Sequence, residues 1–306
     1  MKVLVTGSQG QLARSLAERA VNHPQIELVT AGRPELDLAV PGSGEAAVRS
    51  IAPDVVINAA AYTAVDQAED EPDRAMRVNG EAAGELAGAA RAIGAPIIQI
   101  STDYVFDGHS AAPYAEDAPT NPIGAYGRSK LAGEERVRQA NPDHLILRTA
   151  WVYSPFGHNF VKTMMRLAQT RDRITVVADQ IGNPSSALDL ADGIFAMLER
   201  WRGGERSGLG GTYHLAGTGS ASWFDFARAI FDECRAQGLP AAEVEAIRTA
   251  DWPTMAARPA NSQLDSSKFE RDFGWQMPEW QEGLADVVSR IASRQGSQRT
   301  QAEAAR

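Results

Sequence analysis

The first twenty residues constrain the fold of this chain more than any other segment. The apolar run Lys2–Thr6 predicts a buried strand, and a glycine loop then leads into a helical pattern over residues 11–21. Further apolar runs alternate with helical patterns at 26–30, 55–58, 97–101 and 144–149. Strands that are apolar throughout and alternate with helices are typical of a parallel sheet covered by helices on both faces. We therefore predict an α/β fold.

The alternation of strands and helices becomes irregular after Trp151, which indicates a second part of the molecule. We predict a Rossmann-like dinucleotide-binding domain over residues 1–150 and a smaller α/β substrate domain over 151–293, some segments of which return to the first sheet. The polar, alanine-rich end, 294–306, is expected to be a flexible tail. Ligands should bind beyond the carboxyl ends of the strands, in the cleft between the two parts.

The segment Gly7–Ala13 is the first candidate binding site, because it lies between the first strand and the first helix. Gly7 allows a tight turn, and Gly10 lets the backbone approach a pyrophosphate at the helix N-terminus. Ala13 replaces the third glycine of the usual pattern but is still small enough for close helix–strand packing. We predict a dinucleotide site here, with a plain turn that binds no ligand as the alternative.

The end of the second predicted strand bears on the choice of cofactor. It reads Thr-Ala-Gly-Arg over 30–33, without the acidic residue that commonly holds the ribose 2′-hydroxyl of NAD. Arg33 can instead pair with a 2′-phosphate, so we favour NADPH and leave NADH open; the alternative is a solvated surface arginine. Asp37, followed by Leu38, can border the adenine or can serve as a turn residue.

Tyr126 and Lys130 form the first half of a candidate catalytic set. They are four residues apart on a predicted helix, so their side chains share one face. We expect the lysine charge to favour the phenolate and so to lower the tyrosine pKa. A tyrosine that gives and regains a proton suits carbonyl reduction. The lysine can also hold the ribose of a nicotinamide cofactor.

Hydroxyl groups at the end of the fourth predicted strand form the second half. Ser101 and Thr102 both follow this strand, and a hydroxyl there can hydrogen-bond to a substrate carbonyl. We favour Thr102 for this role. The alternative for either hydroxyl is a hydrogen bond to nearby backbone.

Together these residues resemble the extended branch of the short-chain dehydrogenase/reductase superfamily. Longer segments are similar to the dTDP-4-dehydrorhamnose reductase family in particular, and the similarity extends over nearly the whole chain. The segments are Asn58–Asp66, Ser101–Gly108, Tyr126–Glu134, Arg148–Tyr153, Asp179–Pro184 and Arg258–Asp265. The second and the last of these are far more specific than the glycine loop.

The resemblance implies the reduction of dTDP-4-dehydro-β-L-rhamnose to dTDP-L-rhamnose, the last step of dTDP-L-rhamnose biosynthesis. NADPH gives a hydride to C4 of the sugar, and Tyr126 protonates the oxygen. Lys130 supports Tyr126 and the cofactor ribose, and Thr102 holds the carbonyl. Positions on the cofactor side are Gly10, Gln11, Leu12, Asp37, Leu38, Ala61, Tyr62 and Thr63.

On the sugar side the resemblance places Asp103, Tyr104 and Trp151. Trp151 can form a pocket wall or belong to the core. Arg258 is a candidate for binding the nucleotide diphosphate, and a surface salt bridge is the competing interpretation. Tyr62 departs from the small residue or histidine that we expect at its position, which bears on the shape of the pocket.

Charge and composition narrow the possible partners. The net charge of −9 makes nucleic acid a poor default partner. The single cysteine, Cys234, excludes an intrachain disulfide, and the first residues resemble neither a signal peptide nor a membrane span. We expect a cytoplasmic protein. The oligomeric state is open, with a homodimer as one option.

The sequence offers no metal site that we can defend, although some members of the resembled family are associated with magnesium. The histidines have no metal-ligand spacing; they are His23, His109, His144, His158 and His214. An acidic run after the third strand is interpreted as a solvated helix start or loop. It comprises Asp66, Glu69, Asp70, Glu71 and Asp73.

Two other functions compete with this hypothesis. One is a different nucleotide-sugar enzyme of the same branch, such as an epimerase or dehydratase, which would retain its NAD. The other is a non-catalytic regulatory subunit of the methionine adenosyltransferase type. The intact set of Thr102, Tyr126 and Lys130 argues against the second, because a binding module needs no acid.

Overall fold

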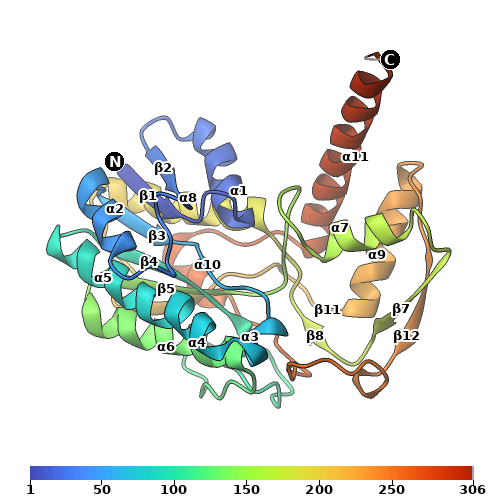
Figure 1. Ribbon diagram of the computed structural model, residues 1–306, viewed down its shortest axis with the longest axis horizontal. Helices are drawn as coiled ribbons and strands as arrows, with labels where there is room; N and C mark the ends of the chain where they lie inside the picture. Colours follow the sequence, from blue (N-terminus) through green and yellow to red (C-terminus); the bar gives the residue numbers. More distant parts are fainter. Residues whose placement is uncertain (305–306) are drawn as a thin grey trace.

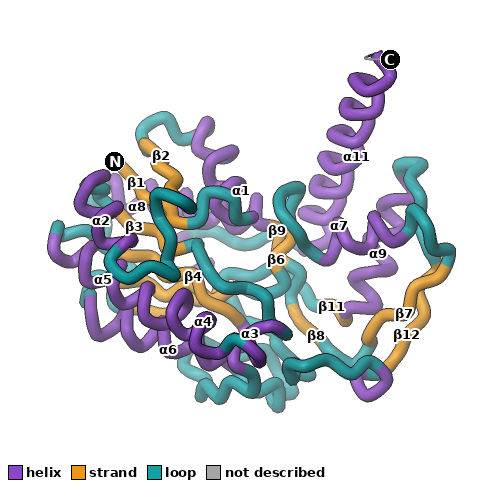
Figure 2. The backbone as a smooth tube through the Cα atoms, in the orientation of Figure 1, coloured by secondary structure: helices purple, strands orange, loops and turns teal. Residues whose placement is uncertain are grey.

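A six-stranded, wholly parallel sheet forms the first part of the molecule in the computed structural model, which describes residues 1–304 (Figures 1 and 2). The strand order is β2–β1–β3–β4–β5–β10. The strands are β1 (Lys2–Thr6), β2 (Glu27–Ala31), β3 (Val55–Asn58), β4 (Ile97–Thr102), β5 (His144–Thr149) and β10 (Gly211–His214). The predicted α/β class is thereby confirmed.

The order of the strands defines where ligands can bind. From β1 the chain moves to β2 on one side and then to β3 on the other, so the connections diverge at the carboxyl ends of β1 and β3. Such a switch point is the usual binding crevice of an open parallel sheet. The edge strand β10 comes from the second half of the sequence and pairs in parallel with β5.

Helices cover both faces of the sheet, because alternate strand residues point to opposite sides. Val3 and Val5 pack under one set of helices and Leu4 under the other. The first set is α1 (Gln11–Arg19), α8 (Ala187–Arg202) and α10 (Ser267–Phe273). The second set is α2 (Ser43–Ile51), α5 (Ala82–Ala92) and α6 (Ala125–Ala140).

The second part of the molecule has its own core, which includes Phe226, Phe231 and Val287. Its main elements are α7 (Phe160–Leu167), β7 (Arg173–Val177), α9 (Trp223–Ala236), β12 (Glu243–Ile247) and α11 (Trp280–Ala304). Short strands join it to the sheet domain; they are β6 (Val152–Tyr153), β8 (Ile181–Gly182), β9 (Ser185–Ser186) and β11 (Ala221–Ser222). Figure 1 shows α11 projecting from this part.

The helix predicted over 81–93 and the tail predicted over 294–306 both fall on longer helical segments. The long helix predicted over 81–93 is preceded by further helical turns, α4 (Pro72–Ala75) and a π-helical segment (Met76–Glu81). Pro72 at the first helical position was the start signal that the sequence analysis missed. The tail expected over 294–306 falls mostly on α11, and residues 305–306 lie outside the described part. Within that part, no helix is both long and apolar enough to cross a membrane.

Candidate active site

The carboxyl end of β4 gives its two hydroxyl residues different surroundings. The Ser101 hydroxyl donates to Glu134 Oε1 at 2.6 Å in the interior, so it is not available to bind a substrate carbonyl. The Thr102 hydroxyl donates to Asp103 Oδ1 at 3.0 Å and lies close enough to Tyr126 to influence the pKa of its phenol. Thr102 is therefore the hydroxyl that lies beside the candidate acid.

Tyr126 and Lys130 lie one turn apart on α6, next to β4. The Tyr126 ring meets Tyr104 edge-on, with 5.6 Å between ring centroids. The Lys130 ammonium group donates to the backbone carbonyl of Ile100 at 2.6 Å, and the side chain is buried. The helix thus presents the phenol to the carboxyl edge of the sheet while its lysine is anchored on β4.

The expected lowering of the Tyr126 pKa by Lys130 is wrong for the free chain. Burial disfavours the phenolate and raises the pKa of Tyr126 to about 12; the hydrogen bond with Thr102 opposes this rise, and the Asp103 charge adds to it. Burial also lowers the pKa of Lys130 to about 8. The ammonium group is directed to a backbone carbonyl, and Lys130 is not among the groups that shift the pKa of Tyr126. Tyr126 is therefore held protonated, as a proton donor must be.

Asp103 is a buried carboxyl group beside Thr102. Burial raises the pKa of Asp103 from 3.8 to about 6, because Oδ2 is buried without a hydrogen-bond partner among the described residues, and the hydrogen bond from Thr102 to Oδ1 offsets only part of the rise. Its neighbour Tyr104 is also shielded, and burial raises the pKa of Tyr104 above its ordinary range. Both residues thus lie in low-dielectric surroundings next to Tyr126.

Asp103→Asn is expected to stabilise the protein at neutral pH. The folded state holds the Asp103 proton more tightly than the unfolded state, so the charged carboxylate destabilises the fold above about pH 6 and the penalty disappears below about pH 4. Asparagine is uncharged at every pH, and the gain at pH 7–8 should be about 2–3 kcal/mol. Urea unfolding of both proteins across this pH range measures it.

Asp107→Asn is the control of opposite sign. Hydrogen bonds from the His109 backbone and the Tyr114 hydroxyl lower the pKa of Asp107, so this substitution should cost stability at pH 7 and less in acid. An Asp103→Asn effect that does not change between pH 4 and pH 8 would show that the Asp103 carboxylate carries no burial penalty.

Trp151 lies at the carboxyl end of β5 with a strained backbone. Its φ of 45° is a left-handed conformation that costs a non-glycine residue of the order of 1 kcal/mol, and such strain gathers at functional sites. The indole stacks on Trp223 at 3.5 Å, nearly parallel, and leaves no room for a side chain at Gly182. Trp223 was missed by the sequence analysis, because a tryptophan at the start of a helix carries no local signal of such a contact.

Arg258 forms an ion pair in this structure. Its Nη2 lies 2.6 Å from Asp66 Oδ2, and the other carboxylate oxygen accepts the Ala256 N–H at 3.1 Å. The guanidinium group also hydrogen-bonds to Tyr104. Arg258 thus forms the kind of salt bridge that was the competing interpretation, with a partner from the acidic run, and its guanidinium group also lies beside Tyr104.

The glycine loop has the geometry of a pyrophosphate cradle. Gly7 adopts φ of 84°, and a Cβ there would lie 3.0 Å from Ala60 Cα, so only glycine fits this turn. No side chain caps the N-terminus of α1, which leaves its first N–H groups free for an anion. The residues present therefore fit a dinucleotide.

Gln11 and Leu12 have further roles that the sequence did not indicate. The Gln11 side chain accepts hydrogen bonds from Ser154 and Asn159, each at 2.9 Å, and so ties α1 to the second part of the molecule. Leu12 packs against the core of the sheet domain. These contacts hold the glycine loop at the junction between the two parts.

Arg33 follows β2 and is exposed, with no ion pair among the described residues. The hydroxyl of Ser8 lies close to Gly32, where a Cβ would be only 2.5 Å from it. Asp37 accepts the N–H of Ala39 at 3.0 Å, which is the turn role foreseen as one of its two options. Leu38 is buried in the core beneath the second set of helices.

The segment Ala61–Thr63 follows β3 at the same edge of the sheet. Asn79, which is buried, accepts the Tyr62 N–H at 2.8 Å and donates to the Ser129 hydroxyl of α6 at 3.0 Å. The Tyr62 hydroxyl donates to Glu71 at 3.1 Å, so the unexpected tyrosine directs its polar end to the acidic run. The segment predicted to border the cofactor is thereby joined to the helix of Tyr126.

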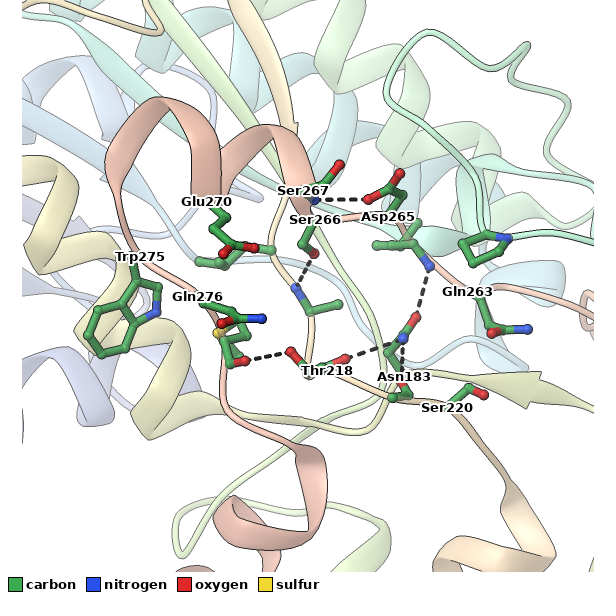
Figure 3. A pocket seen from close by; sticks show the side chains of 17 residues that line it. Asn183, Thr218, Ser220, Gln263, Asp265, Ser266, Ser267, Glu270, Trp275 and Gln276 are labelled. Atoms are coloured by element: carbon green, nitrogen blue, oxygen red, sulfur yellow. Dashed lines mark hydrogen bonds between the residues drawn. The ribbon is translucent and has the colours of Figure 1, made fainter.

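A separate cavity of about 330 Å³ lies beside α10 (Figure 3). It is lined by the loop after β10, residues 215–220, and by residues of 263–267 and 275–277. Asn183 joins two of these walls, because its amide donates to the Gly219 carbonyl and accepts the Leu264 N–H. None of Thr102, Tyr126 and Lys130 lines this cavity, so it does not contain the candidate catalytic set.

Comparisons with known proteins establish the family. The family model described as the RmlD substrate binding domain matches residues 1–293. A dTDP-4-dehydrorhamnose reductase from Sinorhizobium fredii is 47% identical over 291 residues, which cover 94% of this chain and 97% of that protein. This chain belongs to the dTDP-4-dehydrorhamnose reductase family. The resemblance inferred from the sequence is confirmed.

Solved structures of dTDP-4-dehydrorhamnose reductases agree with this assignment. One from Clostridium acetobutylicum is 38% identical, with a TM-score of 0.86 and coverage of 94% of this chain and 99% of that chain. Another, from Bacillus anthracis in complex with NADP, is also 38% identical, with a TM-score of 0.86 and coverage of 94% and 98%.

Magnesium was left open by the sequence, which assigned no residues to it. Within the described part, no three His, Cys, Asp or Glu side chains are grouped so that they could hold a metal ion.

Proposed function

We propose that this protein reduces dTDP-4-dehydro-β-L-rhamnose to dTDP-L-rhamnose with NADPH in the cytoplasm. The observation that carries the proposal is that Thr102, at the carboxyl end of β4, lies beside Tyr126 of α6, in a chain of this family. Thr102 orients the C4 carbonyl, and Tyr126 gives its proton to the oxygen. The bound cofactor supplies the hydride.

The remaining site residues position these two groups. Lys130 holds α6 on β4 and can turn to the cofactor ribose. Asp103, Tyr104 and Trp151 surround the sugar position, and Arg258 exchanges Asp66 for the diphosphate of the substrate. Gly7, Gly10, Gln11 and Ala61–Thr63 contact the dinucleotide. The free, buried thiol of Cys234 suits a reducing compartment.

The proposal is tested by following the loss of dihydronicotinamide absorbance with enzymatically generated dTDP-4-dehydro-β-L-rhamnose. The unepimerised 4-keto precursor serves as the matched control substrate. We expect turnover only with the epimerised sugar and dTDP-L-rhamnose as the product. Absence of turnover with either sugar, by a folded protein that binds nucleotide, would contradict the proposal. NAD retained through purification would favour an epimerase or dehydratase instead.

Arg33→Ala tests the choice of cofactor. Arg33 and the Ser8 hydroxyl flank Gly32 at the end of β2, where the ribose 2′-phosphate is expected. Loss of one charge-assisted hydrogen bond should raise KM for NADPH by about 10- to 100-fold. KM for NADH should stay the same, which makes NADH the internal control. Equal changes with both cofactors would remove Arg33 from 2′-phosphate recognition.

A further inference from the structure

The acidic run after β3 makes defined contacts, although the side chains of Asp66, Glu69 and Glu71 stay partly exposed. Asp66 pairs with Arg258, and Glu71 accepts hydrogen bonds from Tyr62, Gln67 and Arg74. Glu69, on the short helix α3 (Gln67–Asp70), is directed to the start of α6. That contact stands next to the candidate acid, and nothing in the proposed chemistry uses it.

Helix α6 begins without a cap of its own. Gly124 precedes the first turn and has no side chain that could accept a hydrogen bond. The N–H of Ala125 instead donates to Glu69 Oε1 at 2.7 Å, although the two residues are 56 positions apart. Glu69 Oε2 lies 3.7 Å from Nη2 of Arg128 in the same turn. The Glu69 carboxylate thus accepts a hydrogen bond from the first N–H group of α6 and also faces the Arg128 guanidinium group.

Packing holds the two segments closely together. Ala68 is fully buried against Ala125, in a small cluster that Tyr62 and Tyr126 border. A Cβ at Gly124 would lie 2.9 Å from Glu69 Oε1, so the absence of a side chain at Gly124 provides the space for this carboxylate. The hydrogen bond therefore belongs to a fitted contact between α3 and the start of α6.

We propose that Glu69 is a positioning residue for Tyr126. Tyr126 directly follows Ala125, so the place of its hydroxyl beside Thr102 depends on how the first turn of α6 is held. Lys130 fixes the next turn through Ile100, and Glu69 fixes the first. The charge that acts on the phenol is that of Asp103, so Glu69 works through geometry. This inference rests on the proposed function, because that function makes Tyr126 the acid.

The test compares Glu69→Ala and Glu69→Gln with Asp70→Ala. Asp70 is the exposed neighbour, without a hydrogen bond or ion pair among the described residues. Glu69→Ala should lower kcat by about 10- to 100-fold, because a misplacement near 1 Å carries a loss of this size. KM for NADPH should stay within about twofold, because the glycine loop is untouched. Glu69→Gln keeps an acceptor oxygen and should retain most of the rate, as should Asp70→Ala.

Two readouts separate positioning from a general loss of folded protein. With NADPH deuterated at the transferred hydrogen, the isotope effect on kcat should increase in Glu69→Ala, since misalignment slows the chemical step. The single-turnover rate constant, measured with enzyme in excess, should fall together with kcat, because misalignment slows hydride transfer itself. A smaller amount of folded enzyme changes neither quantity.

Gly124→Ala keeps the proposal testable if Glu69→Ala does not fold. Its φ of −121° accepts alanine, and the added methyl group displaces the carboxylate without removing its charge. We expect a smaller loss of kcat in the same direction. Hydrogen exchange at the start of α6 should become faster in Gly124→Ala and Glu69→Ala but not in Asp70→Ala.

Failure of this inference and failure of the proposed function give different results. A wild-type protein that does not reduce the sugar contradicts the proposed function, whereas hydrogen exchange at α6 still tests the Glu69 contact. An active wild type with normal kcat, isotope effect and exchange in Glu69→Ala overturns the positioning role. Equal losses in Glu69→Ala and Asp70→Ala overturn it as well.

Discussion

Tyr126→Phe is expected to lower kcat by about 10²- to 10⁴-fold, the usual contribution of a positioned proton donor. The substitution removes only the hydroxyl that lies beside Thr102, and phenylalanine keeps the edge-on contact with Tyr104. Since burial holds the pKa of Tyr126 near 12, the lost group is a protonated donor over the neutral range. Binding of NADPH should change by less than about threefold, because the substitution leaves the glycine loop unchanged.

Single-turnover rates and NADPH affinity, measured on the same preparation, check this expectation. Tyr213→Phe is a suitable control, because it also removes a tyrosine hydroxyl, here one that hydrogen-bonds to Asp272 of α10. The control should cost some stability and leave kcat unchanged. A Tyr126→Phe protein with a rate near that of the wild type would exclude Tyr126 as the acid.

The sheet and the catalytic edge could be predicted because their signals are local. Apolar runs fix the strands, and hydroxyl residues directly after β4 must lie at its carboxyl end. The spacing of Tyr126 and Lys130 correctly places both on one helix face. This spacing does not show that both side chains are shielded, or that the Lys130 ammonium group donates to the Ile100 carbonyl of β4. The direction of the Tyr126 pKa could therefore not be derived from the spacing.

In the acidic run after β3, too, the partners of the side chains lie far away in the sequence. Asp66 and Arg258 are 192 residues apart, and Glu69 meets Ala125 across 56. A charged residue in a polar segment looks solvated in sequence, since only the tertiary fold supplies its partner. The run does contain the starts of α3 and α4, and its acidic side chains stay partly exposed, but the partners of Asp66, Glu69 and Glu71 could not be derived from the sequence.

Glu134 is a buried carboxylate whose burial and partner could not be derived from the sequence. It follows Lys130 by one turn of α6 and is fully buried. Arg148 Nε and Nη2 donate to its two oxygens at 2.9 and 2.8 Å, and Ser101 donates at 2.6 Å. Burial acts to raise the pKa of Glu134, but the hydrogen bonds and charge of Arg148 outweigh it and hold the pKa below its ordinary value. The pair joins α6 to β5 directly beneath the site.

Glu134→Ala is expected to destabilise the protein by about 3–5 kcal/mol, because it leaves the Arg148 guanidinium buried without a counter-charge. Chemical denaturation of the variant beside Glu135→Ala, an exposed neighbour on the same helix, measures the difference. Replacing the pair together, by Glu134→Leu with Arg148→Met, should recover much of the loss, since two apolar side chains need no mutual charge. If the double variant is no more stable than Glu134→Ala, then the loss reflects packing or the Ser101 contact, and the unpaired charge of Arg148 is not its cause.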